Sequence, residues 1–224
     1  PIDFLRRAAL VHATRTAVVY NETRMSYADF ATRCRRLGSA LRKAGVKTGD
    51  TVAVMAPNIP ALLEAHYGVP LAGGVLNAIN VRLDAASIRF GLAHGAAKVL
   101  LADRDYAGVV REALSGLSNP PLVIDIVDPA GRDGHPPSMA IGERDYETFL
   151  ASGDADFAWT LPDGEWQSIA LNYTSGTTGL PKAIVHGHGG ILIETLKALA
   201  FHWDLREGDR CLFYTTTGWM MWNW

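Results

Sequence analysis

Short apolar segments alternate with amphipathic helical segments along most of this sequence, and that alternation restricts the fold more than any other feature. Apolar runs typical of buried strands occupy residues 51–55, 75–79, 98–102, 122–127 and 167–173. Helical patterns separate the first four: one follows Asn58, its expected cap, one runs from Asp84 to about Gly95, and one covers residues 106–114. Strands joined by single helices form βαβ units. We therefore predict an α/β fold, with a doubly wound, mainly parallel sheet and helices on both faces.

Before this alternation, the chain predicts a hairpin followed by a long helix. Residues 17–25 contain a β-branched run, a polar turn and a second short run, which is typical of a small β-hairpin. Ser26, with Asp29 three residues later, is expected to cap a helix that ends at Gly45. Cys34 falls on the apolar face of this helix. We expect it to be a core thiol rather than a reactive nucleophile.

Composition narrows the class of partner. The 224 residues suffice for one large domain or two small ones, and 48% hydrophobic with 20% charged residues is ordinary for a globular protein. The net charge of -2 provides no basic field for a nucleic-acid backbone. The longest uncharged stretch, residues 65–81, is interrupted by Gly, Pro and Asn and does not predict a membrane span. The two cysteines favour a reducing, cytoplasmic setting.

One segment carries most of the chemical information. Residues 173–182 read YTSGTTGLPK, in which hydroxyl residues and glycines precede a lysine. Glycines let several backbone N–H groups point toward one ligand, hydroxyls add donors, and Lys182 adds a positive charge, which together suit a polyphosphate. A flexible linker is the alternative. We favour a phosphate loop because the segment follows an expected strand and precedes a helix expected at residues 190–201.

This segment resembles the phosphate-binding loop of the AMP-forming adenylating enzymes, which include acyl-CoA synthetases, luciferases and peptide-synthetase adenylation domains. The spacing differs from the GxxxxGK[ST] loop of other nucleotide-binding proteins. Further upstream, MSYADF, GVKTGDTVAVMAPN and LNAINVRLDAASI are similar to the N-terminal half of acyl-CoA synthetases. The resemblance covers almost the whole chain and implies the large N-terminal domain of an adenylate-forming enzyme.

The resemblance implies a two-step reaction. A small carboxylic acid attacks MgATP to give an acyl-adenylate and pyrophosphate, and the thiol of coenzyme A then displaces AMP. ATP, Mg²⁺ and coenzyme A are thus the implied cofactors, with no resident metal site. The resemblance assigns phosphate binding to Thr174, Ser175, Gly176, Thr177, Thr178, Gly179 and Lys182. Lys182 is also the implied catalytic residue, because it stabilises charge that develops as pyrophosphate leaves.

Past Lys182 the subfamily signals disagree. AIVHGHGG and TTTGWMMWNW are similar to acetoacetyl-CoA synthetases, whereas earlier segments resemble ligases for medium-chain acids or methylmercaptopropionate. The chain is either an intermediate natural sequence or a composite joined near the loop. By resemblance, Gly218 and Trp219 belong to the acid pocket, although Trp219 is equally compatible with a core position. His188 is expected to form hydrogen bonds near the loop, and its spacing from His186 is only a weak metal signal.

The end of the sequence generates a further expectation. Residues 211–224 carry no charged side chain, and the later motifs of the family do not occur. We therefore expect residues 1–224 to be a partial adenylation domain without the C-terminal domain, inactive alone. Two alternatives stay open: a truncated, non-catalytic protein with a vestigial phosphate loop, and adenylation for an acceptor other than coenzyme A. The oligomeric state is not predicted.

Overall fold

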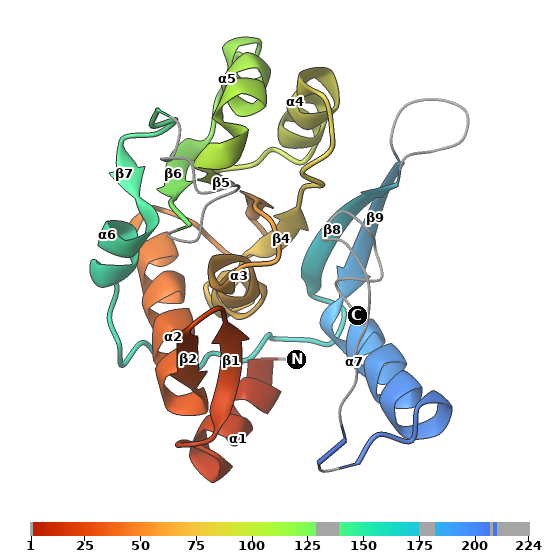
Figure 1. Cartoon of the computed structure of the whole chain (residues 1–224). Helices are drawn as coiled ribbons and strands as arrows, with labels where there is room; N and C mark the ends of the chain where they lie inside the picture. Colours follow the sequence, from red (N-terminus) through yellow and green to blue (C-terminus); the bar gives the residue numbers. More distant parts are fainter. Residues whose placement is uncertain (1, 129–138, 175–181, 207, 210–224) are drawn as a thin grey trace.

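The fold is a twisted sheet with helices on both of its faces and a projecting hairpin (Figure 1). The computed structural model describes residues 2–128, 139–174, 182–206 and 208–209. The elements before the central sheet are α1 (Ile2–Val11), β1 (Thr16–Tyr20), β2 (Thr23–Ser26) and α2 (Tyr27–Lys43). The elements of the βαβ region are β3 (Thr51–Met55), α3 (Pro60–Leu71), β4 (Val75–Ala78), α4 (Ala85–His94), β5 (Val99–Asp103), the short η1 (Arg104–Tyr106), α5 (Ala107–Ser115) and β6 (Leu122–Ile126). The remaining elements are β7 (Arg144–Asp145), α6 (Tyr146–Ala151), β8 (Ser168–Thr174), β9 (Lys182–Gly187), α7 (His188–Lys197) and η3 (Ala198–His202).

The sheet confirms the expected doubly wound topology. Among the described residues its strand order is β7-β6-β5-β3-β4-β8-β9. All neighbouring pairs are parallel except β8 and β9, which are antiparallel. Val52 of β3 has Leu76 of β4 and Val99 of β5 as its register partners. The first βαβ connection therefore places β4 on one side of β3, and the second runs from β4 back past β3 to place β5 on its other side.

Strand β3 is buried throughout, and apolar from Val52 to Met55, because both faces of the sheet are covered. Side chains alternate between faces along a strand, so Val52 and Val54 join one core and Ala53 and Met55 join the other. The first core is formed with α2, α3 and α6, and the second with α4 and α5. Figure 1 shows these two groups of helices on opposite sides of the sheet. The apolar runs in the strands and the periodic apolar residues in the helices are therefore the two sides of the same contact between sheet and helices.

Two glycines allow α2 and α3 to pack closely. A Cβ atom on Gly68 would lie 2.7–2.8 Å from side-chain carbons of Leu37, and one on Gly38 would lie 3.2 Å from the carbonyl oxygen of Gly68. Leu37 is fully buried at this contact. The space that a side chain would need is therefore already filled by the opposite helix.

A buried charged network joins α2, α3 and α6. Glu64 is completely buried, and its carboxylate accepts hydrogen bonds from Arg33 Nε at 2.5 Å and from the Tyr146 hydroxyl at 2.7 Å. Arg33 also pairs with Glu147 at 2.6 Å. Burial raises the pKa of Glu64, while Arg33 and Tyr146 oppose this effect by stabilising the carboxylate. The three helices are thus linked by polar contacts as well as by the apolar core.

Most expected elements are confirmed, with local corrections. Ser26 and Asp84 cap α2 and α4 through hydrogen bonds to the backbone amides of Asp29 and Ser87. Cys34 is fully buried, as expected for a core thiol. The expectation that Asn58 caps α3 is wrong, because the cap is Ile59, without a side-chain hydrogen bond, and Pro60 occupies the first turn.

The sequence did not indicate α1, β7 or α6, which are short or lie at the edge of the regular pattern. Most of the loop expected over residues 128–142 falls at residues 129–138, outside the described residues. Within the described ranges, no helix has both the length and the apolar character required to cross a membrane.

Replacing Gly68 with alanine is expected to destabilise the protein by about 1–3 kcal/mol, because the added methyl group overlaps Leu37. Gly108 on α5 provides the matched control, since a Cβ there meets nothing within 4 Å. Gly108→Ala is expected to raise the free energy of unfolding by about 0.4–1 kcal/mol. Urea denaturation of both variants measures these effects, and equal stability of the two would contradict the close packing of α2 and α3.

Arg33→Leu is expected to lower the free energy of unfolding by about 3–5 kcal/mol, because it leaves Glu64 buried without its cation. The pKa of Glu64 in the folded variant then lies further above its unfolded value of about 4.3, so stability falls as the pH rises toward the folded pKa. The deficit relative to wild type should be larger at pH 8 than at pH 5. In the control, Glu64→Leu added to Arg33→Leu should recover most of the loss and remove its pH dependence.

Candidate functional site

The hairpin of β8 and β9 brings together the two described ends of the expected phosphate loop. Thr174 ends β8, Lys182 begins β9, and the two are register partners across the antiparallel pair. Residues in such positions have Cα atoms about 4.5–5.5 Å apart. The segment between them therefore leaves and re-enters the sheet at one place. Because β8 is parallel to β4, this place lies at the carboxyl edge of the sheet, where open α/β sheets bind ligands.

Lys182 has an accessible amino group at this position. Its side chain is exposed, and none of the described residues forms an ion pair or hydrogen bond with it. An ammonium group that has no partner in this part of the chain is available to an anionic ligand. The structure thus places one predicted site residue, Lys182, beside the backbone of another, Thr174.

The other predicted site residues cannot be placed. The phosphate-loop residues outside the described part of the chain are Ser175, Gly176, Thr177, Thr178 and Gly179. Gly218 and Trp219, expected in the acid pocket, also lie outside it. Their assigned roles stay predictions.

The connection after the loop differs from the expected one. The helix expected at residues 190–201 is present as α7, which begins at His188, but the strand β9, which was not expected, lies between the loop and this helix. Residues 182 to 187 form an extended strand, so the start of α7 lies about 20 Å from Lys182. Its first amides are also occupied, because the N–H of His188 donates to Gln167 O and that of Gly189 to Glu165 O. The helix dipole of α7 therefore does not serve a phosphate at the loop.

The same geometry corrects the expectation for His188. Its side chain is 5% exposed and lies at the far end of β9 from Lys182. Burial lowers the pKa of His188 to about 4, so its imidazole is neutral at pH 7. Among the described residues neither of its ring nitrogens has a hydrogen-bond partner. No group of three potential metal-ligating side chains occurs among those residues either.

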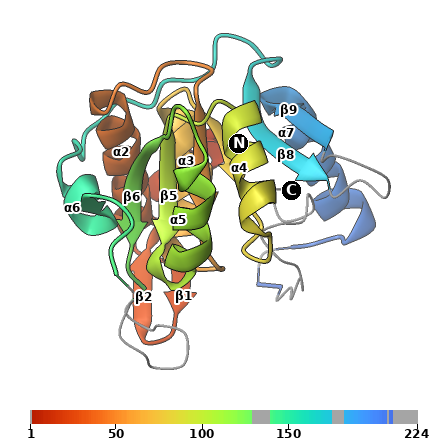
Figure 2. The ribbon, with the colours of Figure 1, turned by 90° about the horizontal axis from the view of Figure 1, so that it is seen from above.

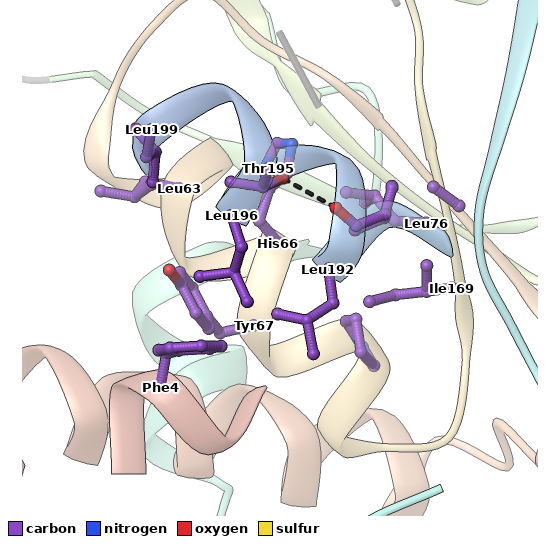
Figure 3. Close-up of a pocket in the computed structure, with 13 residues that line it drawn as sticks. Phe4, Leu63, His66, Tyr67, Leu76, Ile169, Leu192, Thr195, Leu196 and Leu199 are labelled. Carbon is purple, nitrogen blue, oxygen red and sulfur yellow. Dashed lines mark hydrogen bonds between the residues drawn. The ribbon is translucent and has the colours of Figure 1, made fainter. Parts of the chain in front are cut away.

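An apolar cavity that the sequence did not indicate lies between α3 and α7. Its volume is about 390 Å³. Figure 3 shows Tyr67 and Leu63 of α3 facing Leu192 and Leu196 of α7 across it. The other lining residues are Phe4, His66, Pro70, Leu76, Ile169, Ala170, Ile191, Thr195 and Leu199. The apolar spacing on the two helices was the available signal, but it does not show which helices face each other.

This cavity lies too far from the loop to hold a small acid for reaction there. Ala170 of β8 lines the cavity, and Thr174 lies four residues further along the same extended strand, a distance of about 14 Å. Reacting atoms must approach to about 3–3.5 Å. A short carboxylic acid in the cavity would not reach a phosphate held at the carboxyl edge. We therefore do not assign the cavity to the acid.

Comparison with known proteins identifies close similarity along nearly the whole chain. The model of the AMP-binding enzyme family matches residues 5–223. An acetate–CoA ligase of Humulus lupulus is 42% identical over 93% of this chain, and an acetate/butyrate–CoA ligase of Arabidopsis thaliana, described as peroxisomal, is 39% identical over 93%. The chain spans 38% of the length of each relative.

Solved structures show the same arrangement of elements. Acetoacetyl-CoA synthetase from Streptomyces lividans superposes with a TM-score of 0.80 and 32% identity, covering 99% of this chain and 35% of that one. A benzoate CoA ligase from Burkholderia xenovorans has the same fold, with a TM-score of 0.71 at 23% identity, covering 90% of this chain and 36% of that one. Since sequence and fold agree over both halves of the chain, it belongs to the AMP-binding enzyme family, whose relatives found here are acyl-CoA ligases.

Proposed function

We propose that the protein carrying this chain is an acyl-CoA synthetase that activates a short carboxylic acid with ATP and transfers the acyl group to coenzyme A. The observation that carries the proposal is the pairing of Thr174 with Lys182 around YTSGTTGLPK at the carboxyl edge of the sheet. The names of the two plant relatives described above, ligases for acetate and for acetate or butyrate, support a short acid.

The residues of the loop fit the phosphates of ATP. Backbone amides and hydroxyls of Thr174, Ser175, Gly176, Thr177, Thr178 and Gly179 would donate hydrogen bonds to the β- and γ-phosphates. Residues 173–182 contain no carboxylate, the side chain that most often binds Mg²⁺ together with substrate phosphates. Mg²⁺ would instead be held by the phosphates and would neutralise part of their charge.

The chemical step requires no nucleophile from the protein. The carboxylate of the acid attacks the α-phosphorus, the bond to the β-phosphate breaks, and pyrophosphate leaves with the electron pair. Lys182 would stabilise the negative charge that develops on the leaving group, which makes its interaction stronger in the transition state than in the ground state. Coenzyme A thiolate would then attack the acyl carbonyl and displace AMP. Gly218 and Trp219 are proposed to contact the acid.

Carboxylate-dependent ATP–pyrophosphate exchange tests this function in protein expressed from the full reading frame that contains these residues. Acetate, butyrate, 2-methylpropanoate and acetoacetate are expected to support exchange and thioester formation, and octanoate and methylmercaptopropionate to support less. Exchange without thioester would favour a different acceptor. Folded protein without any exchange would support the truncated, non-catalytic alternative.

Lys182→Ala is expected to lower kcat/KM for MgATP in this assay by about 10²–10³-fold, because it removes a charge aimed at the leaving group. Lys182→Arg should keep part of the activity. Lys197→Ala is the matched control: this exposed lysine pairs only with Glu194 on α7 among the described residues, at 2.6 Å, and its loss should leave the rate unchanged. If both substitutions lowered kcat/KM for MgATP equally, the role proposed for Lys182 would be contradicted.

A further inference from the structure

The end of β8 that leads into the phosphate loop has little support from the parallel sheet. Its register with β4 consists of one pair, Leu76 with Ala170. From Leu171 to Thr174 the described partners of β8 lie on β9, from Val185 to Lys182. Figure 1 shows β8 and β9 diverging from β4 toward the loop. A two-stranded hairpin is marginally stable alone, so the position of this end depends on other contacts.

Tyr173, the residue before Thr174, provides such a contact with α4. Its hydroxyl donates a hydrogen bond to Gly91 O at 3.4 Å and shares a second one, of 3.0 Å, with His94 Nδ1. Its ring meets Phe90 and His94 edge to face, with centroids 6.1 and 5.8 Å away. Phe90 and His94 stack on each other at 5.3 Å. Three rings, from segments 79 residues apart, thus form one cluster, which we call the Tyr173 cluster.

Helix α4, which carries Phe90 and His94, is itself held in place by several contacts. Its first turn is capped by Asp84, which accepts a hydrogen bond from the Ser87 amide at 2.7 Å. Ile88 and Leu92 are buried in the second core, against β3 and β5. On another face, Arg89 donates to the carbonyl oxygens of Glu112 and Ala113 at the end of α5. Figure 2 shows α4 lying between α5 and β8.

The end of α4 is also shaped to approach β8. A Cβ atom on Gly95 would lie 3.1 Å from Leu171 Cδ2 and 3.2 Å from the Tyr173 hydroxyl oxygen, closer than ordinary van der Waals contact. The absence of a side chain at this position therefore lets the helix end meet the unsupported part of β8.

We propose that Phe90 and His94 hold Tyr173 in place, and that His94 and Tyr173 are positioning residues for phosphate binding. This inference rests on the proposed function of the loop. The cluster touches no phosphate; it fixes the strand end from which the loop starts. Without the Tyr173 cluster, phosphate binding must first order this strand end. The apparent affinity is then the intrinsic affinity multiplied by the fraction of protein in which the strand end is already ordered.

Steady-state kinetics of Tyr173→Phe and His94→Ala measure this effect. Both are expected to raise KM for MgATP by about threefold to tenfold, the factor that corresponds to one aromatic or hydrogen-bonded contact, with kcat within about twofold. His94→Phe keeps the stacked ring and should recover part of the loss. Changed kcat at constant KM, or no recovery with His94→Phe, would overturn the inference.

A histidine and a tyrosine elsewhere in the fold provide the matched control. The rings of His12 and Tyr27 lie 6.5 Å apart where α1 is followed by the β1–β2 hairpin and α2 begins. In Figure 1 this region is far from the tip of β8 and β9. His12→Ala should leave KM for MgATP unchanged. If His12→Ala raised KM for MgATP as much as His94→Ala, the loss of any such ring contact would be enough to weaken binding, and the inference would fail.

Direct binding separates this inference from the proposed function. Calorimetry with inorganic pyrophosphate is expected to show threefold to tenfold weaker binding for Tyr173→Phe and His94→Ala. Hydrogen exchange without nucleotide should become faster at residues 171–174 and stay the same in β3. If the proposed function is wrong, the wild-type protein will show no carboxylate-dependent ATP–pyrophosphate exchange. Unchanged pyrophosphate affinity in the variants would overturn the inference whether or not wild type is active.

Discussion

The burial of β3 on both faces is the constraint on which the rest of the structure depends. Its five residues are all buried, and the four from Val52 to Met55 are apolar, so neither face can remain open to water. Helices are therefore required on both faces of the sheet, and the crossover connections between the parallel strands supply them. The close approach at Gly38 and Gly68 and the network around Glu64 follow from packing α2, α3 and α6 into one of these layers.

At the carboxyl edge of the sheet, the arrangement favours phosphate binding by individual hydrogen-bond donors and a lysine rather than by the dipole of a helix. The loop joins two antiparallel strands, and α7 starts at the opposite end of β9 with its first amides already bonded. Binding of a polyphosphate there would depend on backbone amides, hydroxyls and the lysine. Small movements of one strand end would change such a site, and this is the physical reason for the positioning role that we propose for the contact of His94 with Tyr173.

Local signals in the sequence were sufficient for the layers but not for contacts between distant segments. Ser26 and Asp84 were identified as caps because a cap and its amide lie three residues apart. Residues 182–187 are a strand that the sequence analysis did not predict, although Ile184 and Val185 are β-branched, because the apolar run is short and ends at His186. The pairing of Tyr173 with His94 has no local signature at all. The position of Lys182 beside Thr174 likewise depends on the register of two strands.

The shared register position of Thr174 and Lys182 has a consequence for how this family can diversify. Because further register pairs, from Ser168–Gly187 to Tyr173–Ala183, also hold these two strands together, the segment between Thr174 and Lys182 is expected to tolerate changes of composition without shifting the rest of the sheet. The entropy cost of closing it grows only slowly with length. Loops from other members could therefore be exchanged as cassettes at this point, and altered nucleotide preference could arise while the layers beneath stay unchanged.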